Sequence, residues 1–231
     1  MNESNMWKQT DEEILQQIPE KLLTWYDQNA RILPWREDPR PYRVWVSEIM
    51  LQQTRVEAVK PYFERFLKAL PTVADLAKAP EEQLLKLWEG LGYYNRVRNL
   101  QRGAQAVMTE HGGVIPASFE LLKTLPGIGE YTAGAIGSIA FQIKVPAVDG
   151  NVLRVISRVL WREDNILDVK VKRRIEGEIR GILPERVGDF NQSLMELGAT
   201  VCLPNGAPKC DECPLQKLCR AHLKGKEESL P

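Results

Sequence analysis

Apolar residues recur along most of the chain at the spacing of an amphipathic helix. The first such segment, "DEEILQQIPEKLLTWYDQ", follows Thr10, which predicts a capping box with Glu13, and contains Pro19, which predicts a bend or break. In "RVWVSEIMLQQTRVEAVKPYFERFLKAL" Pro61 predicts another break, whereas "NRVRNLQRGAQAVMTEHGG" is typical of a helix that ends at paired glycines. Because no long alternating segment predicts a strand, we expect an all-α fold of many short helices.

Further helices are predicted on the way to the C-terminus. Thr72 with Asp75 indicates a capped start, and Pro80 opens "EEQLLKLWEGL" in its first turn. The remaining helical segments are "SFELLKTL", "EYTAGAIGSIAF", "NVLRVISRVLW", "KVKRRIEGEIRGIL" and "DFNQSLMELGATVC". The last residues, "AHLKGKEESLP", are polar, and we expect a linker or a frayed end there.

Composition and charge bound the function only loosely. The 231 residues are 43% hydrophobic and 27% charged, as in an ordinary globular protein, and no apolar run approaches the length of a membrane span. The formal net charge of zero argues mildly against a strong nucleic-acid binder, although "YYNRVRNLQR" and "VKVKRR" concentrate basic residues. The polar start lacks the apolar stretch of a signal peptide, so we expect a cytoplasmic protein.

The turn Leu125-Pro126-Gly127-Ile128-Gly129 separates two helical segments. Gly127 and Gly129 would let the backbone adopt conformations that other residues resist, and would remove side chains that block a close approach. The N–H groups at the start of the second helix, together with the helix dipole, can bind a phosphate without a Lys or Arg. A plain tight turn between two helices is the simpler alternative.

All four cysteines fall in one short cluster, at Cys202, Cys210, Cys213 and Cys219. In a cytoplasmic chain such a cluster indicates a metal site rather than a disulfide framework. Structural zinc usually takes paired short Cys-x-x-Cys knuckles or histidines at helical spacing, whereas only one Cys-x-x-Cys occurs here. Four thiolates suit an iron–sulfur cluster equally well, so both metals stay open on chemistry alone.

The hairpin, Asp149 twenty residues after Gly129, and the four C-terminal cysteines together resemble the endonuclease III superfamily of DNA glycosylases. The upstream string "WVSEIMLQQTRV" is similar to the adenine-glycosylase branch, MutY, which removes adenine mispaired with 8-oxoguanine. The resemblance covers nearly the whole chain, from about Leu23 to Cys219.

This resemblance implies a helix-hairpin-helix glycosylase fold in two domains. A six-helix barrel would span residues 28–141, and residues 1–27 and 142–231 would form a discontinuous iron–sulfur cluster domain. Double-stranded DNA with an adenine mispair would bind a monomer in the cleft between them, in the nucleoid of a bacterial-type cell. The cysteines would hold a [4Fe–4S] cluster, although seven residues follow Cys202 before the next cysteine where the family usually has six. Because relatives continue into a domain that helps recognise 8-oxoguanine, we expect this chain to be a catalytic fragment, with a natural short form as the alternative.

Glu48 and Asp149 are the candidate catalytic carboxylates. Glu48 lies among apolar residues in "VWVSEIML", which would raise its pKa and suit a proton donor, whereas Asp149 precedes a helix whose N-terminus favours the ionised form. The resemblance implies that Glu48 protonates the adenine ring and that Asp149 stabilises the cationic sugar, with Asn151 positioning the aspartate or the water. On local sequence alone, Glu48 could be an exposed helical residue and Asp149 an ordinary helix cap.

The resemblance also implies which residues reach the base. Strand-cleaving relatives carry a lysine where this chain has Tyr131, and a phenol cannot form their Schiff base, so we expect a monofunctional glycosylase. The adenine must be flipped out of the duplex; Gln53 and Thr54 would fill the gap and Tyr93 would wedge between bases. The residues implied for the adenine pocket are Trp35, Arg36, Leu51 and Gln192, and those for the hairpin's grip on DNA are Leu125, Gly127 and Gly129.

Two alternatives share parts of this pattern. A pyrimidine glycosylase with lyase activity, like endonuclease III itself, would share the hairpin and cysteines, but Tyr131 and "SEIMLQQT" argue against it. A non-catalytic DNA-binding protein with a structural zinc or iron–sulfur site would explain the same two features. It gives no reason for both Glu48 and Asp149.

Overall fold

The computed structural model of this chain describes residues 9–231, so the first eight residues of the predicted domain 1–27 lie outside the described part. Within that part there are helices, turns and loops but no β-strand, which confirms the all-α prediction. The internal contacts divide the chain into two units. We call Arg31–Ile143 the contiguous unit, and residues up to Ala30 together with Lys144–Pro231 the split unit.

The contiguous unit is built around α5, which packs against α4, α6, α9 and α11. Its core holds the largest side chains of the unit, including Trp45, Trp88, Phe63 and Phe66, all almost fully buried. The helices of this unit are α4 (Pro34–Glu37), α5 (Pro41–Leu51), α6 (Val56–Ala69), α7 (Val73–Lys78), α8 (Glu81–Trp88), α9 (Asn95–Glu110), α10 (Phe119–Thr124) and α11 (Glu130–Phe141).

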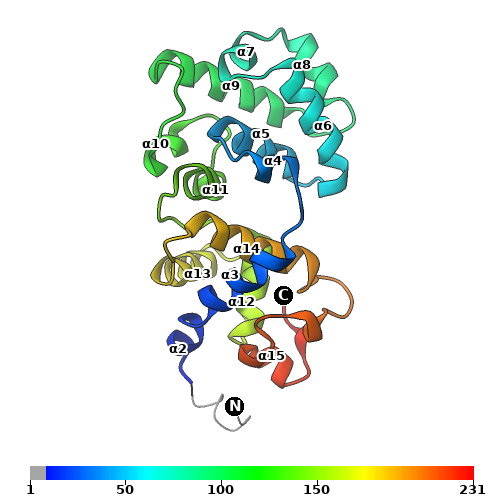
Figure 1. The fold of residues 1–231 in the computed structure, drawn as a ribbon, viewed down its shortest axis with the longest axis vertical. Helices are drawn as coiled ribbons and strands as arrows, with labels where there is room; N and C mark the ends of the chain where they lie inside the picture. The colour runs from blue at the N-terminus through cyan, green and yellow to red at the C-terminus, as the bar shows by residue number, and fades with distance from the viewer. Residues whose placement is uncertain (1–8) are drawn as a thin grey trace. The chain divides into compact units, whose positions relative to one another are not determined.

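The split unit places its N-terminal helices beside helices from the other end of the chain, as α3 beside α14 in Figure 1. α12 is central and packs against α13, α14 and α15, with its apolar residues buried among theirs. The elements are α2 (Asp11–Leu15), α3 (Ile18–Asn29), α12 (Gly150–Val159), α13 (Val169–Gly181), α14 (Val187–Thr200) and α15 (Arg220–Leu223), with 3-10 turns η1 (Cys210–Glu212), η2 (Gln216–Leu218) and η3 (Glu227–Ser229).

The local signals for helix ends are confirmed at most positions. Thr10 and Thr72 each form the predicted capping box, accepting a hydrogen bond from the third helical residue while its carboxylate bonds back. The predicted break at Pro19 is present, because α2 ends at Leu15 and the proline lies in the first turn of α3, where its missing N–H costs no helical bond. Pro80 is the N-cap of α8 rather than part of its first turn.

The break predicted at Pro61 is wrong. Pro61 lies inside α6, exposed to solvent, and the chain breaks instead at residues 52–55, between α5 and α6. On the opposite face of α6, Val59, Phe63 and Phe66 are buried. We attribute the continuity of the helix to this burial, which outweighs the single backbone hydrogen bond that a proline removes.

The linker or frayed end expected in the last residues is also wrong. Leu230 is buried, and its carbonyl oxygen accepts a hydrogen bond from Arg158 at 3.5 Å. The Lys224 ammonium lies 4.0 Å from the centre of the Trp161 ring. The polar composition of the tail does not indicate these contacts. Each of them joins the tail to a residue far away in the sequence.

None of the helices within residues 9–231 combines the length and the apolar character that crossing a membrane would require.

Candidate functional site

The predicted hairpin is formed by α10, the turn at residues 125–129, and α11. Leu125 is buried and Gly127 adopts the left-handed backbone, with φ of 80°. A Cβ atom at Gly127 would come within 2.9 Å of the Asn99 Cβ, so only glycine permits this approach. The conformational expectation for Gly129 is wrong, because its φ of −92° is open to any residue and a Cβ there would meet no described protein atom within 4 Å. Its contact with DNA stays a prediction.

The start of α11 retains the features of an anion site. Gly129 is its N-cap and supplies no side chain to the first turn. The N–H groups of that turn therefore have no side-chain cap, and they lie at the positive end of a twelve-residue helix. Such a turn can bind a phosphate oxygen through backbone groups alone.

Glu48 and Tyr131 are brought together by the packing of α5 against α11. Glu48 is only 7% exposed, and the Tyr131 hydroxyl donates a hydrogen bond of 2.8 Å to its Oε2. The alternative of an exposed helical glutamate is therefore wrong. A buried carboxyl held by a phenol is fixed in orientation, which is what a proton donor needs.

Gln53 and Tyr93 both lie in exposed loops with a left-handed backbone. Their φ angles are 57° and 47°, and the Tyr93 side chain is 65% exposed. Non-glycine residues adopt this conformation rarely, and they cluster where function requires it. Thr54, half-buried, follows Gln53 directly.

The four residues expected to line a base pocket lie in both units. Trp35 is buried and makes an edge-on contact with Phe63, their ring centres 5.4 Å apart. Arg36 donates to the carbonyl oxygen of Arg31 at 3.2 Å. Leu51 ends α5 in the contiguous unit, whereas Gln192 lies on α14 in the split unit, so their common pocket stays a prediction.

Asp149 caps the N-terminus of α12. Its Oδ1 accepts from the Val152 backbone N–H at 2.9 Å, and its Oδ2 accepts from the Asn151 side-chain amide at 2.7 Å. Burial raises the pKa of the Asp149 carboxyl above its ordinary value, and the hydrogen bonds from Val152 and Asn151 only partly oppose it. The sequence argument predicted the opposite direction, since it considered the helix N-terminus but not the loss of water.

Sequence reasoning missed two side chains near Asp149: one bonds Asn151, and the other bonds the segment that leads to Asp149. Arg154 Nη2 donates to Asn151 Oδ1 at 2.9 Å, and its Nε donates to the Cys202 carbonyl oxygen at 2.9 Å. The buried Asn191 bonds residues 145–147, the extended segment that leads to Asp149, and donates to the Val145 carbonyl oxygen at 2.9 Å. Arg154 carries only a weak signal in the sequence, since it lies four residues before a second arginine on a mostly apolar helix.

Gly198 allows α14 to approach this network. A Cβ atom at Gly198 would lie 2.5 Å from the Asn151 Cβ, which real atoms do not tolerate. Its carbonyl oxygen also accepts from Arg154 Nη2 at 2.8 Å. The aspartate, the asparagine and the arginine therefore form one chain of contacts that ends at the backbone of Cys202.

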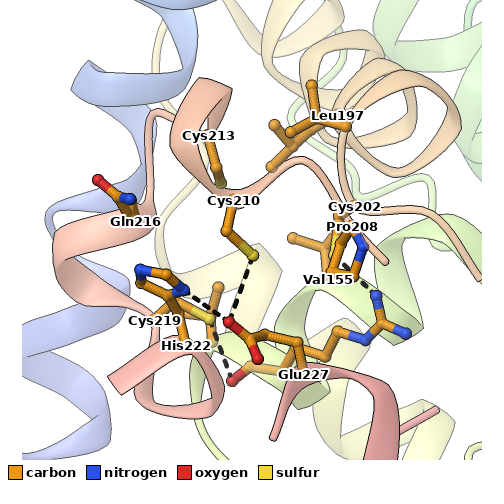
Figure 2. Close-up of a pocket in the computed structure, with 13 residues that line it drawn as sticks. Val155, Leu197, Cys202, Pro208, Cys210, Cys213, Gln216, Cys219, His222 and Glu227 are labelled. Carbon is orange, nitrogen blue, oxygen red and sulfur yellow. Dashed lines mark hydrogen bonds and ion pairs between the residues drawn. The ribbon is translucent and has the colours of Figure 1, made fainter. Parts of the chain in front are cut away.

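The four cysteines line a single pocket, shown in Figure 2, and form no disulfide. Burial raises the pKa of the Cys213 thiol to about 12 and that of Cys219 to about 11. Burial and the neighbouring Glu227 carboxylate raise the pKa of Cys210 to about 12. These thiols bind a metal only by losing their protons, which the metal's own charge makes favourable.

A buried arginine makes this pocket suitable for a negatively charged metal–thiolate centre. Arg158, only 2% exposed, lines the pocket, and its Nη1 lies 3.5 Å from Cys202 Sγ. Among the described residues, its Nε has no hydrogen-bond partner. A buried cation with an unused donor is costly unless negative charge lies near it.

The tail closes another side of the same pocket. Glu227 accepts from His222 at 2.6 Å and lies 3.5 Å from Cys210 Sγ (Figure 2). Cys210, His222 and Glu227 bring three possible ligand atoms within 4.8 Å of one another. The pocket therefore offers four thiols, with an imidazole and a carboxylate at its edge.

Comparison with known proteins gives one family model and many relatives. Residues 46–180 match the model for the HhH-GPD superfamily base excision DNA repair protein. The chain is 48% identical to the adenine DNA glycosylase of Rattus norvegicus and 48% identical to that of Homo sapiens, over 91% and 90% of its length. It is 40% identical to that of Buchnera aphidicola subsp. Acyrthosiphon pisum, over 91% of its length. These matches span 43%, 40% and 60% of the three relatives, so the chain is well short of their full length.

Solved structures resemble the fold closely. A thermostable thymine-DNA glycosylase matches with a TM-score of 0.83 and 29% identity, over 92% of this chain and 98% of the other. Endonuclease III in a trapped covalent intermediate with DNA matches with a TM-score of 0.76 over 94% and 99% of the two chains. At 24% identity, this second likeness concerns the fold alone.

Proposed function

The chain belongs to the HhH-GPD superfamily of base excision DNA repair proteins, and from this premise we propose that it is an adenine DNA glycosylase. Its substrate would be double-stranded DNA with adenine opposite 8-oxoguanine or guanine. The observation that carries the proposal is the 48% identity to adenine DNA glycosylases over nine-tenths of the chain. The paired Glu48 and Tyr131 and the capped Asp149 support it with chemistry of the right kind.

In this proposal the contiguous unit grips and opens the duplex. The uncapped first turn of α11 binds a backbone phosphate through its N–H groups. The adenine must leave the stack before its glycosidic bond can be reached. The exposed Tyr93 wedges between bases, and Gln53 with Thr54 fills the gap beside the orphaned partner.

Glu48 and Asp149 then act on different parts of the glycosidic bond. Glu48, oriented by the Tyr131 hydroxyl, gives its proton to the adenine ring, and the C–N bond breaks with its electrons moving to the base. The sugar is left with oxocarbenium character, which the Asp149 carboxylate stabilises, and water completes the hydrolysis. Asn151 holds Asp149 Oδ2 in place during these steps.

We propose a monofunctional enzyme. A lyase of this superfamily uses an amine to form a Schiff base with the sugar. Tyr131 offers a phenol, and its hydroxyl is bonded to Glu48. Product DNA should therefore carry an intact strand with an abasic site.

The four cysteines would hold a [4Fe–4S] cluster in this proposal, with Arg158 beside it. When bound, the cluster would crosslink the segment after α14 to the start of α15 through Fe–S bonds. Purified protein should then be brown and contain iron and acid-labile sulfide in equal amounts. If the purified protein contained zinc instead of iron, the iron–sulfur cluster would be contradicted and the glycosylase proposal would be unaffected.

The decisive experiment is adenine release under single-turnover conditions. Asp149→Asn should slow release from an adenine–8-oxoguanine duplex by about a hundredfold or more, because a neutral amide cannot stabilise the sugar cation. Asparagine still offers an oxygen to cap α12, so the fold should survive. Asp168→Asn is the control, since Asp168 also caps a helix, α13, by accepting from the Lys170 backbone N–H, and it should react at the wild-type rate.

Strand scission separates the remaining possibilities. Breaks that appear only after alkali support a monofunctional glycosylase, whereas breaks without alkali would indicate a lyase. Duplex binding with no adenine release by the wild-type chain would contradict the proposed activity.

A further inference from the structure

Arg96 lies where two loops meet the first turn of α9. Loop 52–55 connects α5 to α6 and carries Gln53. Arg96 Nη1 donates to the carbonyl oxygens of Ile49 and Met50, at 3.0 and 3.1 Å, and to that of Gln52. These carbonyls belong to the C-terminal end of α5, where helical partners run out and a cation is favoured.

The other nitrogen of the same guanidinium holds the second loop. Loop 89–94 connects α8 to α9 and carries Tyr93. Arg96 Nη2 donates to the carbonyl oxygens of Leu91 and Gly92 at 3.0 and 3.3 Å. It also lies 3.3 Å from Thr54 Oγ1, so it reaches back to loop 52–55.

Two aromatic rings complete the surroundings of the charge. The Arg96 guanidinium carbon lies 5.4 Å from the Trp88 ring centre and 5.6 Å from that of Tyr93. Trp88 in turn donates from its indole nitrogen to the Gly92 carbonyl oxygen at 3.1 Å. Both Gln53 and Tyr93 have left-handed backbones, which persist only where the surroundings determine them.

We propose that Arg96 is a positioning residue that sets the spacing and backbone geometry of loops 52–55 and 89–94 as one rigid pair. This inference rests on the proposed function, in which Gln53 and Tyr93 insert into the duplex together. One planar cation with two donor nitrogens facing two loops fixes their separation. A lysine ammonium is a point charge on a flexible stem and cannot reproduce this fork.

The test compares Arg96→Lys with Arg98→Lys. Arg98 lies on the same helix and pairs with Glu81 on the surface, so its change to lysine is a matched control. Base flipping is followed by a fluorescent adenine analogue placed opposite 8-oxoguanine, and adenine release is followed in single turnover. Arg96→Lys should weaken flipping and slow release by roughly tenfold to a hundredfold, because a misplacement of about 1 Å has that effect. Arg98→Lys should change neither.

A double-mutant cycle distinguishes positioning from a general loss of structure. If Arg96 acts through the two wedging side chains, its effect on flipping disappears once they have been removed in Gln53→Ala/Tyr93→Ala. If Arg96→Lys weakens base flipping by the same factor with and without the Gln53 and Tyr93 side chains, the proposal is overturned. Wild-type flipping in Arg96→Lys would also overturn it.

Thr54→Val provides a second route if Arg96→Lys does not fold. It removes one acceptor of the Arg96 guanidinium with little change of shape, and should weaken flipping to a smaller extent with the same dependence on Tyr93. An effect that is independent of Tyr93 would contradict the inference. Failure of the wild-type chain to release adenine would contradict the proposed function instead, so the two failures are distinguishable.

Discussion

A single carboxyl illustrates how far residue type and local sequence can carry a functional argument. The position of Asp149 before a helix correctly predicts the cap, and its Oδ1 accepts the expected backbone bond. The same position suggests an easily ionised group, yet burial raises the pKa of Asp149. A carboxyl whose charged form is disfavoured by its surroundings is a stronger partner for a developing cation than a well-hydrated one.

Asn151→Ala tests this balance through pH. The Asn151 side-chain bond lowers the Asp149 pKa, so its removal should raise that pKa further. The proposed role needs the ionised carboxylate, and the rate therefore falls as pH drops through this pKa. In single-turnover profiles between about pH 4 and pH 8, the acid limb of Asn151→Ala should lie at higher pH than that of the wild type.

Asn29→Ala is the control for this profile. Asn29 donates to the Trp25 carbonyl oxygen one turn back on α3, and the removal of its side chain should leave the acid limb in place. An acid limb in Asn151→Ala that coincides with the wild type would show that this amide does not govern Asp149.

At the scale of elements, the sequence predicts most helices because their apolar period and caps are local. The helix end at Gly112 and Gly113, the capping boxes and the absence of strands within residues 9–231 are all confirmed. The errors at Pro61 and in the tail share one cause. A proline on the solvent side of α6 and a buried Leu230 depend on packing partners that no local window contains.

The residues of the candidate site also differ in whether a local pattern marks them. The sequence predicts Glu48, Asp149 and the cysteines as site residues because a motif or a spacing marks them. Arg96 and Asn191 were missed because they bond backbone carbonyls more than forty residues away, and any residue supplies a carbonyl. The side chains of the accepting residues therefore could not have indicated these hydrogen bonds.

At the scale of the whole molecule, one carboxylate ties the two ends of the split unit together. Asp11, at the start of α2, accepts from Arg162 at 2.8 Å and from Arg220 at 2.6 Å. Arg220 directly follows Cys219, the last of the four cysteines. Partial burial works to raise the pKa of Asp11, but the two arginines hold it below its ordinary value.

Asp11→Asn should therefore destabilise the protein at neutral pH. The expected loss is about 1 kcal/mol, as for partly exposed ion pairs. Because the folded pKa is depressed, the stabilising effect is present above the unfolded pKa and is lost as pH falls through the folded one. Denaturant unfolding at neutral pH and in acid should show the difference between wild type and variant shrinking in acid.

Asp164→Asn provides a matched comparison, since Asp164 is about as exposed and pairs with a single arginine, Arg174. Its effect should be smaller at neutral pH. Equal effects of the two variants, or a difference for Asp11→Asn that persists in acid, would contradict the role assigned to Asp11.

The split unit also imposes an order on the folding of the chain during translation. As the chain leaves the ribosome, Arg31–Ile143 can complete its own contacts as soon as it has been made. Ile14, Ile18 and Leu22, fully buried in the finished fold, gain their packing partners only after α12 and α14 have been translated. The first helices therefore expose apolar side chains until translation has passed Thr200, and exposed apolar surface of this kind makes a nascent chain prone to aggregation.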